Sequence, residues 1–377
     1  MLTLVDHFTS TGGAERLSAR MAMRLDPERF EAIYCASRWD ESRTNENQAE
    51  LRREFERAGV RTLGLGRDSK LAVWQWRPLV ALLRRERIEI IHSHKYGSNI
   101  WAVVLGRLFR VPVVVAHEHS WSYEGRPLRK FLDRRLIARG ASAFLTVSEE
   151  DRRRMIEIER IDPDQVTLLP NGIDALPEAD GAHVRAELGI PAGAPVLVSV
   201  AVLREEKQLH LLVRATAELV GDFPELRMLV AGEGPQREPL EALIEELGVG
   251  HAVRLLGSRG DVPDLLAASD VAVLCSRFEG TPLSVLEYMD AGLPVVATRV
   301  GGLPHVIEHG VHGLLTDPGD AHSLAEGIRA LLDDPERARR MGAAGRERRR
   351  EHYDFGRTLR TLERLYEDLL ARSGRPA

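Results

Sequence analysis

Short apolar runs alternate with amphipathic helical stretches along the whole 377-residue chain. The runs are nearly continuous rather than alternating apolar and polar, which is typical of parallel strands covered by helices on both faces. Strand–helix alternation of this kind predicts α/β domains with doubly wound, Rossmann-like sheets. The expected strands form two series, at residues 2–6, 32–35, 88–92, 113–116, 143–147 and 166–169, and at residues 196–202, 227–231, 253–256, 271–274 and 294–297.

A stretch rich in Gly, Pro, Ala and Asp separates the two series, from Asn171 to Pro195. A chain of this length exceeds one ordinary hydrophobic core, so two domains are expected. We predict a first domain over residues 1–174, a second over 175–355, and a C-terminal helix within 356–377 that packs across the domain junction. Ligands of doubly wound sheets bind at the carboxyl ends of the strands, so the two sets of strand-end loops are expected to face each other across a cleft.

Composition indicates where in the cell the protein resides. The longest apolar runs, such as residues 196–203, are far shorter than the roughly 20 residues that span a membrane. The N-terminal residues lack a basic leader and enter a strand directly, so no signal peptide is expected. Cys35 and Cys275 lie far apart, which argues against a disulfide framework and favours a reducing cytoplasm. Nucleic acid is not an expected partner.

Residues 126–139 carry six basic side chains and a single acid, Asp133. Apolar residues recur at helical spacing within this segment, which predicts a basic amphipathic helix; they are Leu128, Phe131, Leu132 and Leu136. One interpretation is a surface helix docked on the core with a solvated basic face. The other is a contact surface for anionic lipid or a phosphorylated acceptor, which would place the protein peripherally on the inner face of the cell membrane.

Two carboxylates eight residues apart, Glu279 and Glu287, bracket the expected start of a helix that follows an apolar run at 270–275. Pro282 suits the first helical position, and Thr281 before it is expected to cap the helix. The amides of residues 281–284 would then point out of the strand's carboxyl end, where anions bind. A helix start that can hold a phosphate, flanked by carboxylates that can hold hydroxyl groups, predicts a sugar-nucleotide site.

Three further loops lie where strands are expected to end. Gly12 and Gly13 follow the first strand, where they either permit close approach of a phosphate or sugar or simply form a tight turn. Arg204 and Lys207 follow the strand at 196–202, where cationic groups can neutralise a diphosphate. The segment 232–235 resembles a dinucleotide-binding loop but has Arg237 at the third glycine position, so nicotinamide binding is rejected.

Two His-x-His pairs, His92/His94 and His117/His119, also lie at expected strand ends. Residues two apart on a strand share a face, so each pair is expected to project together. A metal interpretation would add Glu118 as a ligand, since imidazole with carboxylate suits zinc or iron, but this residue points to the opposite face if the strand continues. Hydrogen bonding to a substrate and a purely structural role remain as the other interpretations.

Together these segments resemble the retaining family-4 glycosyltransferases, which have the GT-B architecture of two Rossmann-like domains. The resemblance spans nearly the whole chain, and the Glu-x7-Glu segment with the following Gly-x-Pro-Val-Val segment is its specific part. The matching segments are residues 12–16, 147–148, 170–174, 207, 232–235, 279–287, 291–298, 301–302 and 313–315.

The resemblance implies transfer of a sugar from a nucleotide-diphosphate sugar to an acceptor hydroxyl, with the anomeric configuration retained. It implies that Glu287 holds the ribose, that Glu279 faces the sugar, and that Lys207 neutralises the leaving diphosphate. Many relatives have an arginine at the position of Val202, so Arg204 is the expected substitute. His119 matches a family histidine near the reacting centre.

The donor-binding residues that the resemblance implies are Gly12, Gly13, Gly280, Thr281, Pro282, Leu283, Ser284 and Glu287. No cofactor and no metal is implied. The implied partners are a nucleotide-sugar donor and a glycan or lipid-linked acceptor of cell-envelope, exopolysaccharide or glycolipid biosynthesis. The alternatives are a sugar-nucleotide epimerase of the same architecture, a metal-dependent hydrolase built on the His-x-His pairs, and a non-enzymatic sugar-nucleotide-binding protein.

Overall fold

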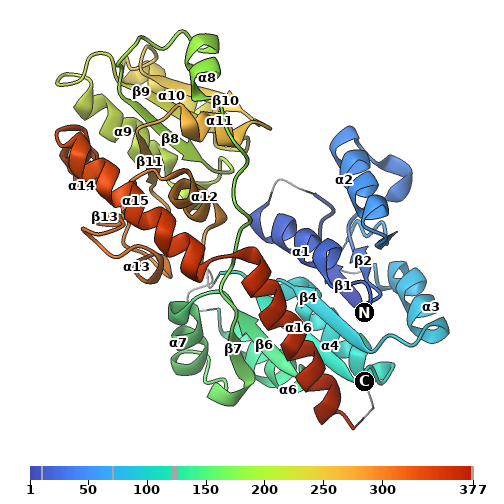
Figure 1. The fold of residues 1–377 in the computed structure, drawn as a ribbon. Helices are drawn as coiled ribbons and strands as arrows, with labels where there is room; N and C mark the ends of the chain where they lie inside the picture. The colour runs from blue at the N-terminus through green and yellow to red at the C-terminus, as the bar shows by residue number, and fades with distance from the viewer. Residues whose placement is uncertain (10–11, 70–71, 121–125, 375–377) are drawn as a thin grey trace. The chain divides into compact units, whose positions relative to one another are not determined.

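A computed structural model describes residues 1–9, 12–69, 72–120 and 126–374 (Figure 1). The chain forms two compact units, the first made of residues 1–171 and 356–377 and the second of residues 172–355. The C-terminal helix α16 (Phe355–Arg372) therefore belongs almost entirely to the first unit. Residues 375–377 of the predicted C-terminal segment lie outside the described residues. No helix in the described part of the chain has the length and apolar character needed to cross a membrane.

The first unit contains a seven-stranded, wholly parallel sheet with the order β3-β2-β1-β4-β5-β6-β7. The chain reverses its direction of winding between β1 and β4, so the loops after these two strands border the usual ligand position of such sheets. Its strands are β1 (Leu2–Val5), β2 (Ile33–Ala36), β3 (Arg61–Gly64), β4 (Ile90–His94), β5 (Val113–Glu118), β6 (Ala143–Thr146) and β7 (Val166–Leu168).

Helices cover both faces of this sheet, as the near-continuous apolar strands predict. Leu4 and Ile91 pack with α3 and α4 on one face. On the other face Tyr34 contacts Phe55 of α2, and His92 contacts Tyr366 of α16. The helices of this unit are α1 (Gly13–Arg24), α2 (Glu46–Arg57), α3 (Arg77–Arg85), α4 (Tyr96–Leu108), α5 (Pro127–Leu132), the π-helical turn η3 (Asp133–Ile137), α6 (Ala138–Gly140), α7 (Glu149–Glu157) and α16.

The second unit contains a six-stranded parallel sheet with the order β10-β9-β8-β11-β12-β13. Here the winding reverses between β8 and β11, so the loops after these strands occupy the position that ligands favour. Its strands are β8 (Val196–Val200), β9 (Arg227–Ala231), β10 (Val253–Gly257), β11 (Val271–Leu274), β12 (Val295–Thr298) and β13 (Gly313–Thr316).

Alternate residues of these strands pack on opposite sides of the sheet. Leu197 and Met228 pack with α9, α10 and α14, whereas Val196 and Leu229 pack with α8 and α11. The helices are α8 (Gly181–Glu187), α9 (Leu209–Leu219), α10 (Arg237–Glu246), α11 (Val262–Ala267), α12 (Leu283–Ala291), α13 (Leu303–Val306), α14 (Ala321–Leu332) and α15 (Pro335–His352), with the short 3-10 turn η5 (Glu205–Lys207).

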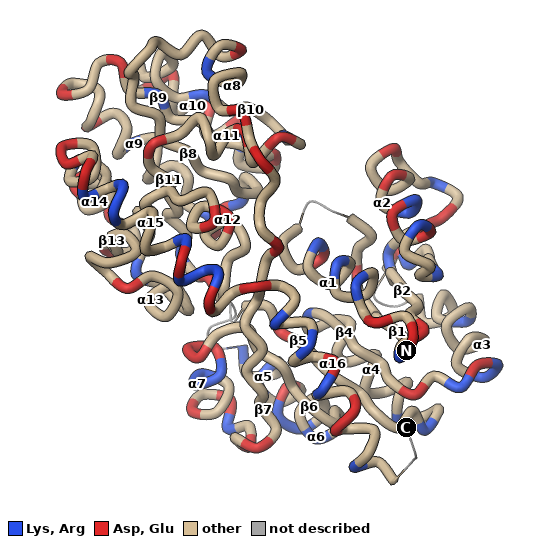
Figure 2. Tube along the Cα trace, viewed as in Figure 1, with Lys and Arg blue, Asp and Glu red and all other residues tan. Residues whose placement is uncertain are grey.

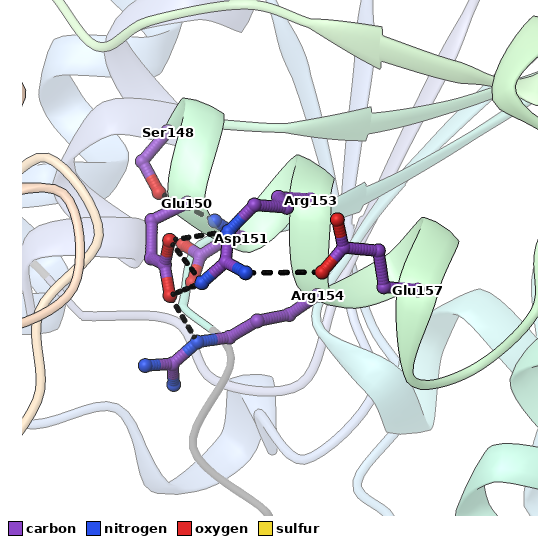
Figure 3. Close-up of polar contacts among 6 residues, drawn as sticks. All are labelled: Ser148, Glu150, Asp151, Arg153, Arg154 and Glu157. Atoms are coloured by element: carbon purple, nitrogen blue, oxygen red, sulfur yellow. Dashed lines mark hydrogen bonds and ion pairs between the residues drawn. The ribbon is translucent and has the colours of Figure 1, made fainter.

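Many helix starts are encoded locally. At the start of α7 the Ser148 hydroxyl oxygen accepts a hydrogen bond from the Asp151 amide at 3.1 Å, as expected of an N-cap residue. Glu150 then accepts bonds from Arg153 and Arg154 on the same helix, at 2.8 and 2.7 Å (Figure 3). Pairs of this spacing stabilise an isolated helix by about 0.2–0.5 kcal/mol each, so they support α7 without determining the fold.

The sequence identified every strand except two. Strand β3 contains one large apolar residue, Leu63, and β13 contains two, Leu314 and Leu315. Both strands lie at an edge of their sheet and pair on one side only. An edge strand needs fewer apolar residues, which is why the periodicity of these segments was too weak to identify them.

Candidate active site

The loops at the reversal point of the second sheet bring Lys207 and Glu279 together. Lys207 ends η5, which follows β8, and Glu279 follows β11. The Lys207 ammonium group donates to Glu279 Oε1 at 2.5 Å. These two residues come from loops that are 72 residues apart in sequence. The sequence placed each at a strand end, and the structure places them in contact.

Hydrogen bonds hold both the side chain and the backbone carbonyl of Glu279. Its side chain also accepts a hydrogen bond from Ser276 Oγ, again at Oε1, at 2.6 Å. Its carbonyl oxygen accepts from the Gly302 amide at 3.0 Å. Gly301 has a φ of +50°, and a Cβ there would lie 1.9 Å from the Glu279 carbonyl oxygen, so only glycine fits this approach. The double-glycine loop therefore fixes Glu279, and only 8% of this residue is exposed.

Ser276 was not among the predicted site residues. It is fully buried, and its own carbonyl oxygen accepts from Thr298 Oγ1 at 2.7 Å. The only sequence signal was its place two residues after the end of β11 and three residues before Glu279. A single serine at such a position is too common to be identified as a site residue from sequence alone.

Lys207 keeps capacity for an anion. An ammonium group has three N–H donors, and Glu279 takes one of them. The side chain is 24% exposed, so Lys207 is only partly enclosed by the protein. Arg204, in contrast, is 59% exposed at its side chain and forms an ion pair with Glu206 at 3.9 Å. The Arg204 guanidinium group thus contacts its own loop, and its predicted role as a diphosphate ligand stays a prediction.

The start of α12 differs by one residue from the sequence prediction. Pro282 has a ψ of 127° and occupies the cap position, and the helix begins at Leu283 without a side-chain cap. The predictions that Thr281 caps the helix and that Pro282 is its first residue were therefore wrong. The first intrahelical bond runs from the Leu286 amide to the Pro282 carbonyl, so the amides of residues 283–285 have no intrahelical acceptor.

The residues around this helix start are packed closely. Gly280, Thr281 and Leu283 are buried and Ser284 is half-buried. Glu287 lies four residues after the first residue of α12, about one turn into the helix. Only 8% of Glu287 is exposed.

The glycines of the 232–235 segment have a structural explanation. A Cβ on Gly232 would lie 1.9 Å from the Ala201 carbonyl oxygen, and one on Gly234 would lie 2.5 Å from that of Leu203. The Leu203 amide donates to the Glu233 carbonyl at 2.9 Å. These glycines let the loop after β9 pack against the end of β8. Packing therefore explains their presence without a bound dinucleotide.

In the first unit, an ion pair joins the loops at the reversal point. Gly12 caps α1 and Gly13 begins it. Lys95, directly after β4, pairs with Glu15 in the first turn of α1. Lys95 also has a φ of +72°, an uncommon conformation for a residue with a side chain, which is most often retained at functional positions.

The four histidines form two hydrogen-bonded pairs on one face of the first sheet. His92 Nε2 and His117 Nδ1 lie 3.2 Å apart, and His94 Nδ1 and His119 Nε2 lie 2.9 Å apart. The pairs stack, with ring centroids 4.2 Å apart for His92 and His94 and 4.3 Å apart for His117 and His119. Each His-x-His pair thus shares a face, as the strand periodicity predicted.

Burial keeps these histidines neutral. Desolvation lowers the pKa of His117 to about 3 and lowers the pKa of the other three well below the usual value. Neutral imidazoles can ligate a metal, and ligand atoms of His92, His94 and His117 lie within 4.8 Å of one another. Glu118, the carboxylate that the metal interpretation added, does not join this group, since its Oε1 accepts a hydrogen bond from Asn99 Nδ2 at 3.2 Å.

Glu118 belongs instead to a polar cluster beneath α5. Its carboxylate lies 3.4 Å from Arg129, which also lies 3.5 Å from the buried Asp133 and stacks over the Tyr96 ring. Burial dominates and raises the pKa of Glu118 to about 8, while Arg129 acts in the opposite direction. Arg129 is therefore turned toward the interior of the unit.

This inward contact changes the face that α5 presents. Leu128 and Phe131, which the interpretation of a helix docked on the core would place inward, are 70% and 59% exposed. Arg129 and Asp133 occupy the inner side in their place, and the wide turn of η3 follows directly. Arg134 and Arg135, which follow in η3, are exposed as well. Figure 2 marks the basic and acidic positions along the backbone.

Comparison with known proteins establishes the class. Residues 182–348 match the family described as Glycosyl transferases group 1, and residues 11–175 match Glycosyltransferase Family 4. The chain belongs to the family-4 glycosyltransferases. It is 30% identical over 318 residues to a D-inositol 3-phosphate glycosyltransferase of Corynebacterium glutamicum, covering 78% of this chain and 76% of the relative.

Other relatives carry different acceptors in their names. The chain is 26% identical to the Escherichia coli UDP-Gal:alpha-D-GlcNAc-diphosphoundecaprenol alpha-1,3-galactosyltransferase, covering 70% of each chain. It is 34% identical to an N-acetyl-alpha-D-glucosaminyl L-malate synthase of Bacillus anthracis, over 51% of this chain and 50% of the relative.

Solved structures agree on the fold. HepE of Anabaena, crystallised with UDP, superposes with a TM-score of 0.82 at 22% identity, over 97% of this chain and 99% of HepE. The sucrose-phosphate synthase of Thermosynechococcus elongatus gives a TM-score of 0.81 at 22% identity, over 98% and 99%. The chain thus has the predicted GT-B fold, and the comparisons support neither the epimerase nor the hydrolase alternative.

Proposed function

We propose that the protein is a retaining glycosyltransferase that moves a sugar from a nucleotide-diphosphate sugar to an acceptor hydroxyl group in cell-envelope, exopolysaccharide or glycolipid biosynthesis. The contact between Lys207 and Glu279 at the reversal point of the second sheet carries the proposal. It puts a cation with unused donors beside a buried carboxylate where doubly wound sheets bind their ligands.

The charge of Lys207 serves the leaving group. Negative charge grows on the departing diphosphate as the bond to the sugar breaks, and a preorganised cation stabilises that charge in the transition state. The two N–H donors that Glu279 leaves unused are available for phosphate oxygens. The amides of residues 283–285 at the start of α12, which have no intrahelical acceptor, add further N–H donors.

The two carboxylates have separate roles in this proposal. Glu279, oriented by Ser276 and by the Gly302 amide, faces the transferred sugar. Glu287 accepts hydrogen bonds from the ribose hydroxyl groups. Lys207 and the helix amides supply positive charge without a divalent metal, so chelation by EDTA should leave turnover unchanged.

Transfer is tested with a donor panel. Purified protein is incubated with UDP-, GDP- and ADP-sugars, and the release of nucleoside diphosphate is measured with and without candidate acceptors. Binding of the correct donor should also raise the apparent melting temperature. Product formed only when an acceptor is present supports transfer. A converted free nucleotide sugar with no acceptor consumed would instead support an epimerase.

The acceptor is proposed to be a glycan or a lipid-linked sugar. One relative's name specifies a diphosphoundecaprenol-linked acceptor, and the outer side of α5 suits an anionic lipid surface. Exposed Leu128 and Phe131 can enter the interfacial region, while Lys130, Arg134 and Arg135 attract anionic headgroups. Each such cation is worth about 1 kcal/mol near an anionic membrane. The protein would thus be cytoplasmic and bound peripherally to the membrane.

Flotation with vesicles tests this contact. We expect binding to vesicles that contain anionic phospholipid and little binding to neutral vesicles. Leu128→Ser with Phe131→Ser should abolish flotation, and so should neutralising Lys130, Arg134 and Arg135. Arg129 is left unchanged because it pairs inward. Trp74→Ser is the matched control, since Trp74 is a comparably exposed apolar residue on another element. Equal loss in this control would contradict the proposed surface.

A further inference from the structure

The C-terminal helix contacts the histidine cluster through one hydroxyl group. Tyr366 on α16 lies with its Oη 2.6 Å from His92 Nδ1. His92 Nε2 in turn lies 3.2 Å from His117 Nδ1. All three residues are at most 1% exposed, so this row of groups is closed to bulk water. Burial also raises the pKa of Tyr366 well above its usual value, which keeps the hydroxyl proton in place.

The protons along this row can be arranged in two ways. In the first, Tyr366 donates to His92 Nδ1, and His92 Nε2–H donates to His117 Nδ1. In the second, every proton is reversed, so that His117 donates to His92 and His92 donates to Tyr366. A neutral imidazole has one N–H and one acceptor nitrogen, so no other arrangement keeps both bonds.

The first arrangement leaves fewer unmatched groups. His117 Nε2 is buried without a partner among the described residues. In the first arrangement the unmatched group is its N–H alone. In the second, the Tyr366 O–H has no acceptor and His117 Nε2 is an unmatched acceptor as well. An unmatched buried group shifts such an equilibrium by roughly 5- to 100-fold, so the first arrangement dominates.

We propose that Tyr366 is a positioning residue that fixes the proton arrangement of His92 and His117, and through them the surroundings of His119. His119 stacks on His117 with the ring centroids 4.3 Å apart, so the direction of the His117 dipole acts on it directly. The inference rests on the proposed transfer activity and on the place near the reacting centre that the family resemblance implies for His119. It gives helix α16 a role in orienting these rings.

Replacing Tyr366 by phenylalanine removes the difference between the two arrangements. Without the hydroxyl group, each arrangement leaves one unmatched N–H and one unmatched acceptor nitrogen. The two arrangements should then be about equally populated. In the parent the first arrangement is favoured by up to about 100-fold. If only this arrangement supports turnover, kcat in Tyr366→Phe falls to roughly half, because only about half of the molecules then have it. The donor KM should not change, because Tyr366 reaches only His92 in the row described.

Imidazole nitrogen NMR of the full-length protein reads the arrangement directly. Protein labelled with ¹⁵N-histidine is compared for the parent and Tyr366→Phe, with the signals of His92 and His117 assigned from His92→Asn and His117→Asn. Protonated and unprotonated ring nitrogens resonate at different positions. We expect one arrangement in the parent, protonated at Nε2 of both rings, and averaged or doubled signals in Tyr366→Phe. Tyr34→Phe is the matched control, because it removes another buried hydroxyl group of this unit, bonded to Ser18.

Four outcomes would overturn the proposal. They are identical spectra for the parent and Tyr366→Phe, equal change in the Tyr34→Phe control, an Nδ1-protonated His92 in the parent, and a stoichiometric metal ion bound to these rings by elemental analysis. A bound metal ion would occupy the nitrogen lone pairs of these imidazole rings, which the proposed hydrogen bonds need as acceptors. An altered proton arrangement with unchanged kcat would refute the positioning role while leaving the transfer activity standing. Absence of turnover in the parent would refute the proposed function and with it that role, while the spectra still report the arrangement.

Discussion

Replacing Lys207 separates what the Lys207–Glu279 pair contributes to stability from what it contributes to turnover. In Lys207→Met, the Glu279 carboxylate stays 8% exposed and keeps only the Ser276 bond at Oε1. Breaking a fully buried pair costs about 3–5 kcal/mol. Because the Lys207 side chain is 24% exposed, water replaces part of the lost contact, and we expect a loss of about 2 kcal/mol.

The double variant Lys207→Met with Glu279→Gln should recover much of that stability. Glutamine is neutral, so it no longer needs the cation, and its carbonyl oxygen can still accept from Ser276. Turnover should not recover. Loss of one preorganised donor to the leaving group lowers kcat by about 10²- to 10³-fold, and nothing in the double variant replaces it.

Thermal unfolding and nucleoside diphosphate release are measured on the parent, both single variants and the double variant. For a unit of this size, about 2 kcal/mol corresponds to a fall in melting temperature of about 4–8 °C. Turnover that recovers together with stability in the double variant would refute the reasoning, because Lys207 would then act only by holding Glu279. Unchanged stability in Lys207→Met would show that the pair is not formed.

Three further predictions follow from single contacts. Glu287→Ala should weaken nucleotide binding in calorimetry more than it lowers the melting temperature; equal affinity in variant and parent would refute the ribose assignment. Glu118→Gln should remove a pH dependence of stability. Burial raises the pKa of Glu118 in the folded protein to about 8, against a reference of 4.5, so the contribution of its protonated form to stability is complete below pH 4.5 and is lost as the pH rises to about 8. The melting temperature of the parent should therefore fall relative to that of the variant between pH 4.5 and 8. Gly301→Ala should destabilise the protein more than Gly319→Ala, by more than about 1 kcal/mol, because both glycines have positive φ but only Gly301 faces a backbone oxygen; equal effects would show that the approach to Glu279 is not tight.

The fold could be predicted because its signal is spread over many residues. Eleven of the strands have apolar runs long enough to read, and the two that were missed, β3 and β13, are edge strands with little apolar content. Helix starts were harder, and α12 begins one residue later than predicted because Pro282 adopts an extended ψ. Local preference alone does not decide between these neighbouring positions.

The site was only partly predictable. Lys207 and Glu279 follow strands, so their position could be inferred, but their contact depends on which strands are neighbours. Ser276 has no pattern of its own. The exposure of Leu128 and Phe131 depends on the inward pairing of Arg129, which joins residues from two different elements. Contacts of this kind arise from tertiary packing, and helical spacing does not encode them.

The most direct test of the account is acceptor-dependent release of nucleoside diphosphate across the panel of UDP-, GDP- and ADP-sugars, with Lys207→Met measured in parallel. The account predicts release from at least one donor, dependence on an acceptor, insensitivity to EDTA, and a loss of about 10²- to 10³-fold in the folded variant. Release from no donor, or equal release by parent and Lys207→Met, would contradict it.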